Sequence, residues 1–152
     1  MDPILYTLFE AADLPALRQL MHDYLTEFDP ESIYADDEYF TALLHGVRTG
    51  THTIWLARKD GISVGFALVR IEQQWYRETV KLGIFEEFYV APAYRRQGIG
   101  RALVARAAEG LRAQGVTAIS ASVVQANVGG LLFWQRLGFR IEAYHLFLTR
   151  RS

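Results

Sequence analysis

The stretch between residues 82 and 114 constrains the fold most, because an apolar segment, a loop rich in arginine and glycine, and an amphipathic segment follow one another. Residues 82–90 are apolar on both faces apart from Glu86 and Glu87, which predicts a buried strand. Residues 99–114 are alanine-rich and amphipathic, which predicts a helix that ends at Gly115. We therefore expect a strand, a loop and a helix in direct succession.

The loop between these two elements has the composition of an anion site. Gly98 and Gly100 let backbone N–H groups approach a ligand, because glycine has no Cβ in the way. The first turn of a helix adds unpaired N–H donors and the positive end of a dipole. Arg95, Arg96 and Arg101 add the positive charge that phosphates favour. The order of elements favours a pyrophosphate site over the alternative, an ordinary turn and helix cap with solvated arginines.

The rest of the chain predicts a mixed α/β sheet. Alternating or β-branched stretches predict further strands at residues 4–9, 51–58, 62–71, 116–124, 139–142 and 144–149, and helical spacing predicts helices over residues 13–25, 39–50 and 130–137. The dipeptide Asp60-Gly61 between two apolar runs predicts a hairpin turn. The resulting order predicts a mixed, mostly antiparallel seven-stranded sheet with helices on both faces.

The composition favours one domain and excludes several kinds of partner. A chain of 152 residues with 51% hydrophobic residues suits a single domain, residues 1–152, with a substantial core. The formal net charge of −1 provides no basic field for nucleic acid or an anionic membrane. Cysteine is absent, no apolar stretch approaches the roughly 20 residues that span a bilayer, and residues 1–15 lack the features of a secretory signal. We expect a cytoplasmic protein without a metal site, since the four histidines show no ligand spacing.

Three motifs resemble those of one known family. The pattern Arg95-x-x-Gly98-x-Gly100 resembles the acetyl-CoA motif of the GNAT acetyltransferases. The sequence EEFYV at residues 86–90 resembles their fourth strand, and Asn127 followed by FWQRLGF at 133–139 resembles a downstream motif. The resemblance is strong over about residues 82–141, weaker elsewhere, and closest in spacing to the spermidine/spermine-type enzymes. It implies a single GNAT acyl-CoA N-acyltransferase domain with acetyl-CoA as cosubstrate.

The resemblance also implies positions for the cosubstrate. Backbone groups at the end of the fourth strand pair with the pantetheine arm, N–H groups from Arg96 to Arg101 hold the pyrophosphate, and Asn127 hydrogen-bonds the arm. The strands after Val90 and around residues 120–122 separate to admit the molecule. The positions assigned in this way are Phe88, Tyr89, Val90, Arg95, Arg96, Gln97, Gly98, Ile99, Gly100, Arg101, Asn127, Gly130 and Phe133.

Transfer of an acetyl group to an amine needs a deprotonated nitrogen, so a general base is expected. Glu86 and Glu87 are the candidates, because a carboxylate in an apolar strand is costly without a role or a partner. Neighbouring strand residues face opposite sides, so only one should face the acceptor unless a bulge intervenes. Glu86 is the first choice by resemblance, and the alternative is a structural carboxylate paired with an arginine. The backbone N–H of Val90 is expected to polarise the thioester carbonyl.

One position departs from the family pattern. Many relatives have a tyrosine, proposed to protonate the leaving thiolate, where this chain has Trp134. The indole N–H is a poor proton donor, so either no acid is needed, or another tyrosine such as Tyr89 or Tyr144 serves, or the protein only binds acyl-CoA. A non-catalytic acyl-CoA-binding or regulatory module is therefore the alternative function, and Trp134 is otherwise interpreted as a core residue.

Residues 23–38 indicate the chemistry of the acceptor. They include seven acidic residues and no basic one, and by resemblance they border the acceptor cleft. A negative rim would concentrate cationic amines, such as a polyamine-like molecule, an aminoglycoside-like amine or a lysine-bearing peptide; the alternative is a solvated loop that supplies helix caps. The aromatic candidates for this cleft, or for the interface of an expected homodimer, are Tyr24, Phe28, Tyr34, Trp75 and Tyr76.

Overall fold

The computed structural model describes residues 3–32 and 34–148 of the chain. The strands are β1 (Leu5–Leu8), β2 (His52–Lys59), β3 (Ile62–Gln74), β4 (Arg77–Val90) and β5 (Ala118–Ala121); the helices are α1 (Leu14–Phe28), α2 (Asp37–Thr49), α3 (Ile99–Ala113) and α4 (Val128–Arg136). Short 3-10 turns precede α1, α2 and the loop before α3. This order confirms the predicted α/β class, and each predicted helix is present.

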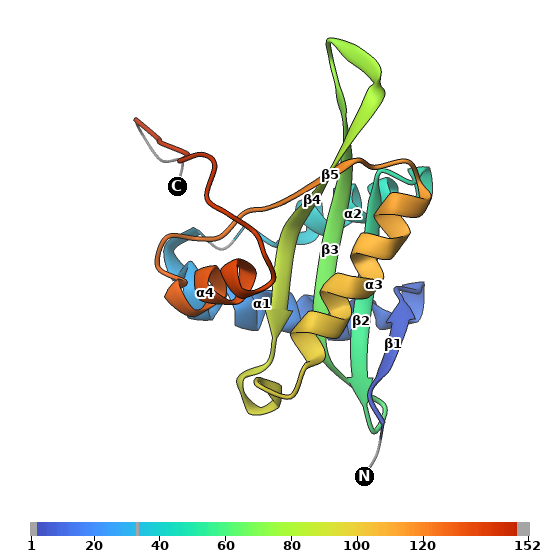
Figure 1. Ribbon diagram of the computed structural model, residues 1–152. Coiled ribbons are helices and arrows are strands. Elements are labelled where there is room, and N and C mark those ends of the chain that lie inside the picture. The colour runs from blue at the N-terminus through green and yellow to red at the C-terminus, as the bar shows by residue number, and fades with distance from the viewer. Residues whose placement is uncertain (1–2, 33, 149–152) are drawn as a thin grey trace.

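The sheet is mixed, as predicted, but smaller than predicted (Figure 1). Among the described residues it has five strands in the order β1-β2-β3-β4-β5, and only the pair β4–β5 is parallel. The prediction of seven strands is wrong, because residues 139–142 and 144–148 run without ladder pairing; Thr149, the end of the second predicted strand, lies outside the described residues. Alternation of apolar residues is a local pattern, whereas a strand also needs a neighbour to accept its hydrogen bonds.

The two hairpins of the sheet follow from their turn residues and their length. Asp60 and Gly61 have φ values of 53° and 76°, as the predicted turn between β2 and β3 requires. The β3–β4 hairpin is longer than predicted, since pairing continues to Gln74 and Arg77, and its tip projects beyond the helices (Figure 1).

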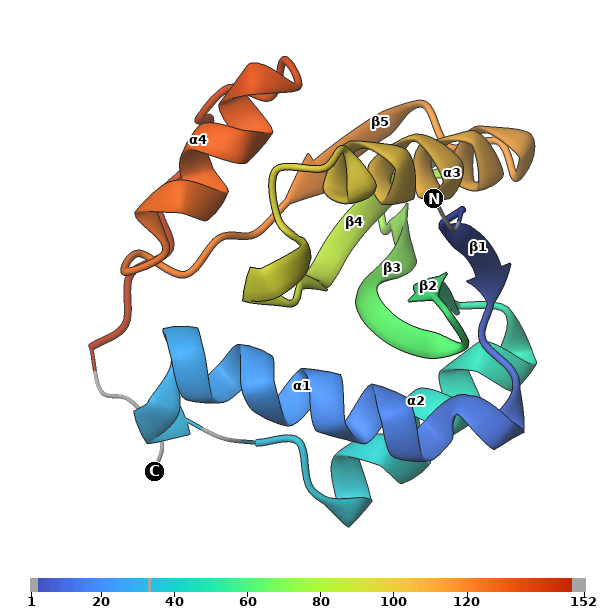
Figure 2. The same ribbon diagram turned by 90° about the horizontal axis from the view of Figure 1, so that it is seen from below.

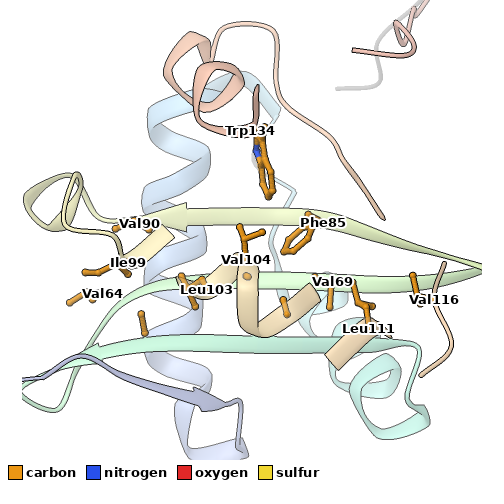
Figure 3. Packing of buried hydrophobic residues seen from close by; sticks show 13 residues of the cluster. Val64, Val69, Phe85, Val90, Ile99, Leu103, Val104, Leu111, Val116 and Trp134 are labelled. Carbon is orange, nitrogen blue, oxygen red and sulfur yellow. The ribbon is translucent and has the colours of Figure 1, made fainter. Parts of the chain in front are cut away.

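The helices cover both faces of the sheet (Figure 2). α1 and α2 lie on one face and pack on side chains such as Phe66 and Leu68. α3 and α4 lie on the other face, where Leu103 and Trp134 pack with Phe85 (Figure 3). Alternate residues of β2, β3 and β4 thus supply two hydrophobic cores. No helix in the described part of the chain is long and apolar enough to cross a bilayer.

Candidate active site

A β-bulge in β4 places two neighbouring glutamates on the same face of the sheet. Leu68 of β3 pairs with Glu87, whereas the next residue, Val69, pairs with Phe85, so Glu86 is the extra residue of the bulge. Both glutamates line one pocket. The bulge is the stated exception to the expectation that only one of them faces this side, because strict alternation of side chains holds only along a regular strand.

This pocket is a cavity of about 360 Å³ between the sheet and α2. Its walls combine aromatic, aliphatic and charged side chains: Tyr34, Tyr39, Ala42, Leu43, His52, Leu68, Arg70, Glu86 and Glu87. The volume suits a small molecule, or one end of a larger one. Sequence reasoning missed Tyr39, His52 and Arg70 here; the available signal was an arginine in the otherwise apolar stretch 64–71.

Glu87 is a buried carboxyl group with one oxygen engaged. Its residue is 8% exposed, and the hydroxyl of Tyr34 donates a hydrogen bond to its Oε1. Its Oε2 has no hydrogen-bond partner among the described residues. Burial raises the pKa of Glu87 to about 7, although the hydroxyl groups of Tyr34 and Tyr24 partly oppose this rise. A group with this pKa exchanges a proton readily near neutral pH.

Glu86 lies in the same pocket but is bound to an arginine. The Nε of Arg70 donates to Oε1 of Glu86 at 2.5 Å. Arg70 also has a weaker neighbour outside the pocket, since its Nη1 lies 3.9 Å from Oε2 of Glu72. Burial and the charge of Arg70 lower the pKa of His52, so this ring contributes no positive charge at neutral pH. The two glutamates of the bulge therefore differ in their partners.

The acidic connection between α1 and α2 contributes one residue to the pocket. Tyr34 lines it, whereas the other four aromatic candidates do not: Tyr24 and Phe28 pack in the core, and Trp75 and Tyr76 sit exposed at the tip of the β3–β4 hairpin. Burial and the carboxylate of Glu87 raise the pKa of Tyr34, so it stays a neutral donor.

Several acidic side chains of this connection have structural roles. Asp36 caps α2 by accepting from the N–H of Tyr39 at 2.9 Å, and Asp37 pairs with Arg18 at 2.8 Å. Glu27 is held by Arg95. These contacts support the interpretation of residues 23–38 as helix caps and ion pairs as much as a negative rim.

The loop before α3 presents free donors. In the described part of the chain, the backbone N–H groups of residues 96–101 form no turn, loop or cap hydrogen bond. Gly98, with φ of 83°, begins α3 without a side-chain cap, and Arg96 also has a positive φ of 62°. The side chain of Ile99 is buried and anchors the start of α3 in the core. Unpaired amides at a helix start, beside exposed arginines, fit a diphosphate.

Arg95 differs from its neighbours, because its guanidinium group is already engaged. Nη1 and Nη2 contact the two carboxylate oxygens of Glu27 at 2.9 and 2.8 Å, and Nε donates to the carbonyl oxygen of Val90 at 2.8 Å. The group also lies over the rings of Phe28 and Tyr89. The side chain of Arg95 therefore braces the loop against α1, whereas Arg96 and Arg101 form no ion pair with any described residue.

The pairing between strands β4 and β5 ends before β4 does. Their pairing runs from Leu82 and Ala118 to Phe85 and Ala121, whereas β4 continues to Val90. Because the N–H of Ala91 bonds to the carbonyl of Val64 on β3, the N–H of Val90 points to the opposite, open edge. Residues 120 and 121 are still paired with β4, so the strands separate just beyond the predicted point on β5, and the separation leaves an edge of β4 beside the loop.

The remaining predicted positions meet at the start of α4. The rings of Phe88 and Phe133 stack at 5.2 Å between centroids, and a Cβ added to Gly100 would lie 3.1 Å from Phe133. Asn127 caps α4 by accepting from the N–H of Gly130 at 2.8 Å, and a Cβ on Gly130 would collide with it. The motif residues thus hold the ends of β4, α3 and α4 together.

The residue at the family's tyrosine position belongs to the core. Trp134 is 5% exposed and contacts the ring of Phe85 (Figure 3). It also contacts the rings of Phe88 and Phe139. Of the two other candidate acids, Tyr89 donates to Glu27 at 3.2 Å on the opposite face, and Tyr144 is exposed after α4. The structure brings neither tyrosine next to Trp134. No cluster of three metal-ligating side chains occurs among the described residues.

Solved structures share this fold along almost the whole chain. An aminoglycoside acetyltransferase from an uncultured soil metagenomic sample, in complex with trehalose, matches with a TM-score of 0.79 and 20% identity, over 97% of each chain. The aminoglycoside N-acetyltransferase AAC(6')-Iy in complex with CoA matches with a TM-score of 0.80 and 18% identity, over 100% of this chain and 97% of that one. A predicted acetyltransferase from Clostridium acetobutylicum with acetyl-CoA matches with a TM-score of 0.81 and 16% identity, over 97% and 96%.

These identities are low, so the structural matches establish the fold alone. A comparison with curated proteins finds no match to this chain. The model of the acetyltransferase (GNAT) family, however, matches residues 14–139, which include the loop before α3 and the start of α4. That match leaves the spermidine/spermine-type subfamily as a prediction. The chain belongs to the acetyltransferase (GNAT) family, whose members are enzymes that use acetyl-CoA as cosubstrate.

Proposed function

We propose that this enzyme acetylates a primary amine of a small cationic acceptor, with Glu87 as the general base. The observation that carries the proposal is the carboxyl group of Glu87, which is buried beside a pocket, has one oxygen without a partner, and has a pKa of about 7. A base is most effective when its pKa lies near the working pH.

The loop before α3 and the open edge of β4 fit acetyl-CoA. Free N–H groups at residues 96–101, with Arg96 and Arg101, would hold the diphosphate. The unpaired edge near Phe88 and Val90 would pair with the pantetheine arm, much as an added strand does. The bound cosubstrate supplies an activated acyl group. The N–H of Val90 would donate to the thioester oxygen, where negative charge develops.

The ammonium group of the acceptor would give one proton to Glu87, and the neutral nitrogen would then attack the thioester carbonyl carbon. A C–N bond forms, the C–S bond breaks, and sulfur leaves with the electron pair as a thiolate, which takes up the second proton that the nitrogen releases. Because an alkylammonium has a pKa of about 10.4, its deprotonation at pH 7 costs roughly 4–5 kcal/mol, which a nearby base lowers. A thiol pKa near 8.5 makes the thiolate a fair leaving group, so the buried Trp134 need not act as an acid.

The proposal moves the base from Glu86, which the resemblance favours, to Glu87. Arg70 occupies an oxygen of Glu86 at 2.5 Å, whereas Oε2 of Glu87 has no partner among the described residues. Protonation of Glu86 would weaken its charge-assisted pair with Arg70, whereas protonation of Glu87 removes a charge from a buried site. The bulge explains why both residues reach the pocket although only one is suited to the role.

The residues that line the pocket favour an acceptor amine that carries positive charge. Two carboxyl groups and one guanidinium group line it, and the faces of Tyr34 and Tyr39 can attract an ammonium group. Two of the solved structures with this fold are aminoglycoside acetyltransferases. We propose an aminoglycoside-like or polyamine-like acceptor, and a cavity of about 360 Å³ suits its amino-bearing end.

Thiol release from acetyl-CoA over a panel of primary amines tests this function. We expect turnover with di- and polyamines, and a loss of at least 100-fold in kcat with Glu87→Gln, within the range for removal of a general base. Glu86→Gln should retain most of its kcat, and isothermal titration with CoA should show unchanged cosubstrate binding in both variants. CoA binding without turnover of any amine would instead support the non-catalytic module.

We also propose that the chain forms a homodimer. The segment after α4 exposes large apolar side chains, among them Tyr144, Leu146, Phe147 and Leu148, and Leu146 is 86% exposed. Strand β5 is a four-residue edge strand of the described sheet. Apolar exposure of this kind is typical of an interface. Light scattering should give twice the chain mass for the wild type and the chain mass for a Leu146→Ser/Phe147→Ser variant.

A further inference from the structure

We propose that the Glu86–Arg70 pair sets the charge of the acceptor pocket and so selects acceptors whose far end is cationic rather than anionic. The inference rests on the proposed function, because it concerns the molecule that occupies the same pocket. It gives Glu86 a role of its own, as a specificity-determining residue beside the base Glu87.

Among the described residues that line the pocket, Arg70 is the only source of positive charge, and Glu86 neutralises it. Among the described residues that line the cavity, Arg70 is the single arginine or lysine, and its Nε lies 2.5 Å from Oε1 of Glu86. The side chains of both residues are about one third exposed, so the pair faces the opening rather than the core. With this pair intact, the remaining charge of the pocket is that of Glu87.

The remaining walls cannot reverse this balance. Tyr34 and Tyr39 are neutral at physiological pH, because burial and the charge of Glu87 raise their pKa values. His52 is neutral as well, since burial and Arg70 lower its pKa. A carboxylate on the acceptor would therefore find no free cation among the described lining residues and would be repelled by Glu87.

Removing the charge of Glu86 and removing the charge of Arg70 should change the preference between cationic and anionic acceptors in opposite directions. Removing the charge of Glu86 frees Arg70, which can then attract an acceptor carboxylate and repel a second ammonium group. Removing the charge of Arg70 leaves Glu86 unpaired and makes the pocket more negative. Removing both charges restores the original balance. In a cavity of about 360 Å³, every group of an acceptor lies within the Debye length of about 8 Å, so the effect does not need direct contact.

Three acceptors with the same reacting amine isolate this effect: 1,4-diaminobutane, butylamine and 4-aminobutanoate. For the wild type we expect kcat/KM to fall in that order. In Glu86→Gln, the ratio of kcat/KM for the diamine to kcat/KM for aminobutanoate should fall at least tenfold (about 1.4 kcal/mol). The kcat/KM for butylamine should change little. In Arg70→Gln the ratio should rise, and the double variant Glu86→Gln/Arg70→Gln should return it to within about threefold of the wild type (about 0.65 kcal/mol).

Glu72→Gln is the matched control, because Glu72 also contacts Arg70, at 3.9 Å, but does not line the pocket. It should change the ratio far less than Glu86→Gln does, because Arg70 stays paired with Glu86. The proposal is overturned if Glu86→Gln lowers kcat/KM for all three acceptors by the same factor, or if the double variant fails to restore the ratio. Circular dichroism of each variant identifies a loss of folding.

The experiment also separates this inference from the proposed function. Turnover of amines without discrimination by far-end charge would refute the inference alone. Absence of turnover with every amine would refute the proposed function, and calorimetric binding of the three acceptors to the CoA-bound protein would then test the charge preference. Equal affinities in that measurement would overturn the inference as well.

Discussion

Glu27 and Arg95 form a bidentate ion pair that joins the last turn of α1 to the loop after β4. Both guanidinium nitrogens meet carboxylate oxygens, at 2.8 and 2.9 Å, and the same arginine holds the carbonyl of Val90. The residues are 68 positions apart in the chain. The pair thereby connects the helix that leads to the acceptor pocket with the loop assigned to acetyl-CoA.

Breaking this pair should weaken CoA binding by the loop more than it lowers the stability of the fold. We expect Glu27→Gln to weaken CoA binding at least fivefold and to lower the free energy of unfolding by about 1 kcal/mol, since the pair is partly exposed. Calorimetric CoA titration and urea unfolding measure the two effects. The matched control is Arg18→Gln, which removes another arginine–carboxylate contact of α1, at 2.8 Å, and should leave CoA affinity unchanged. Equal CoA affinity in Glu27→Gln and the wild type would contradict this role.

The buried carboxyl group of Glu87 should make stability depend on pH. Because burial raises its pKa from 4.5 to about 7, ionisation disfavours the folded state: stability is full below about pH 4.5 and falls as the pH rises through 7. We expect Glu87→Gln to be more stable than the wild type by roughly 3 kcal/mol at pH 8 and equally stable at pH 4.

Chemical denaturation at several pH values measures this difference. Glu109→Gln is the control, since Glu109 is an exposed glutamate on α3 and its replacement should change stability little at any pH. A Glu87→Gln variant that gains nothing at pH 8 would show that the carboxyl group is not buried in the way described.

The hydroxyl of Tyr34 should shift the pH profile of the reaction. Its hydrogen bond to Glu87 lowers the pKa of that carboxyl group, so its removal raises it. We expect the wild-type kcat/KM to rise with pH through an inflection near 7, and Tyr34→Phe to move that inflection to higher pH. Tyr76→Phe changes an exposed tyrosine at the hairpin tip and should keep the wild-type profile. An inflection at the same pH in Tyr34→Phe and the wild type would show that Tyr34 does not influence the pKa of the catalytic base.

Two glycines of the loop should be intolerant of a methyl group for different reasons. Gly98 has φ of 83°, where alanine costs about 1–2 kcal/mol, and a Cβ on Gly100 would press on Phe133 at 3.1 Å. We expect Gly98→Ala and Gly100→Ala to weaken CoA binding at least tenfold. Gly110→Ala, in open space on the same helix, should instead stabilise the protein by about 0.5–1 kcal/mol and leave CoA binding unchanged. Normal CoA affinity in Gly98→Ala would contradict the loop's assignment.

Trp134 should matter for stability and little for chemistry. Its ring packs against Phe85, Phe88 and Phe139, so Trp134→Phe should lower the free energy of unfolding by about 1–3 kcal/mol. Its kcat at saturating acetyl-CoA should stay within about threefold of the wild type (about 0.65 kcal/mol). Thiol-release kinetics and urea unfolding test the two parts, and a fall of more than 100-fold in kcat would point to a direct role for the indole.

Local patterns of the sequence were enough to locate the cosubstrate loop. Residues 82–90, the loop with Gly98 and Gly100, and the amphipathic residues 99–114 are contiguous, so strand, loop and helix could be predicted from spacing and from glycine chemistry alone. The hairpin at Asp60-Gly61 is local in the same sense, because two positive φ angles suit those residues. The two glutamates were also identified as unusual, because carboxylates rarely occupy an apolar strand.

The acceptor pocket, by contrast, was decided by tertiary structure. A single extra residue in β4 turns Glu87 to the face of Glu86, and this depends on its pairing with β3 rather than on any local pattern. Arg70, Tyr34 and Glu87 come from three separate segments, so their contacts depend on how α1, α2 and the sheet pack. The same holds for the strands predicted at residues 139–142 and 144–149: the described residues 139–148 have no ladder partner, and no local pattern supplies one. Periodicity describes a segment, whereas a charge balance or a raised pKa belongs to side chains that meet only after folding.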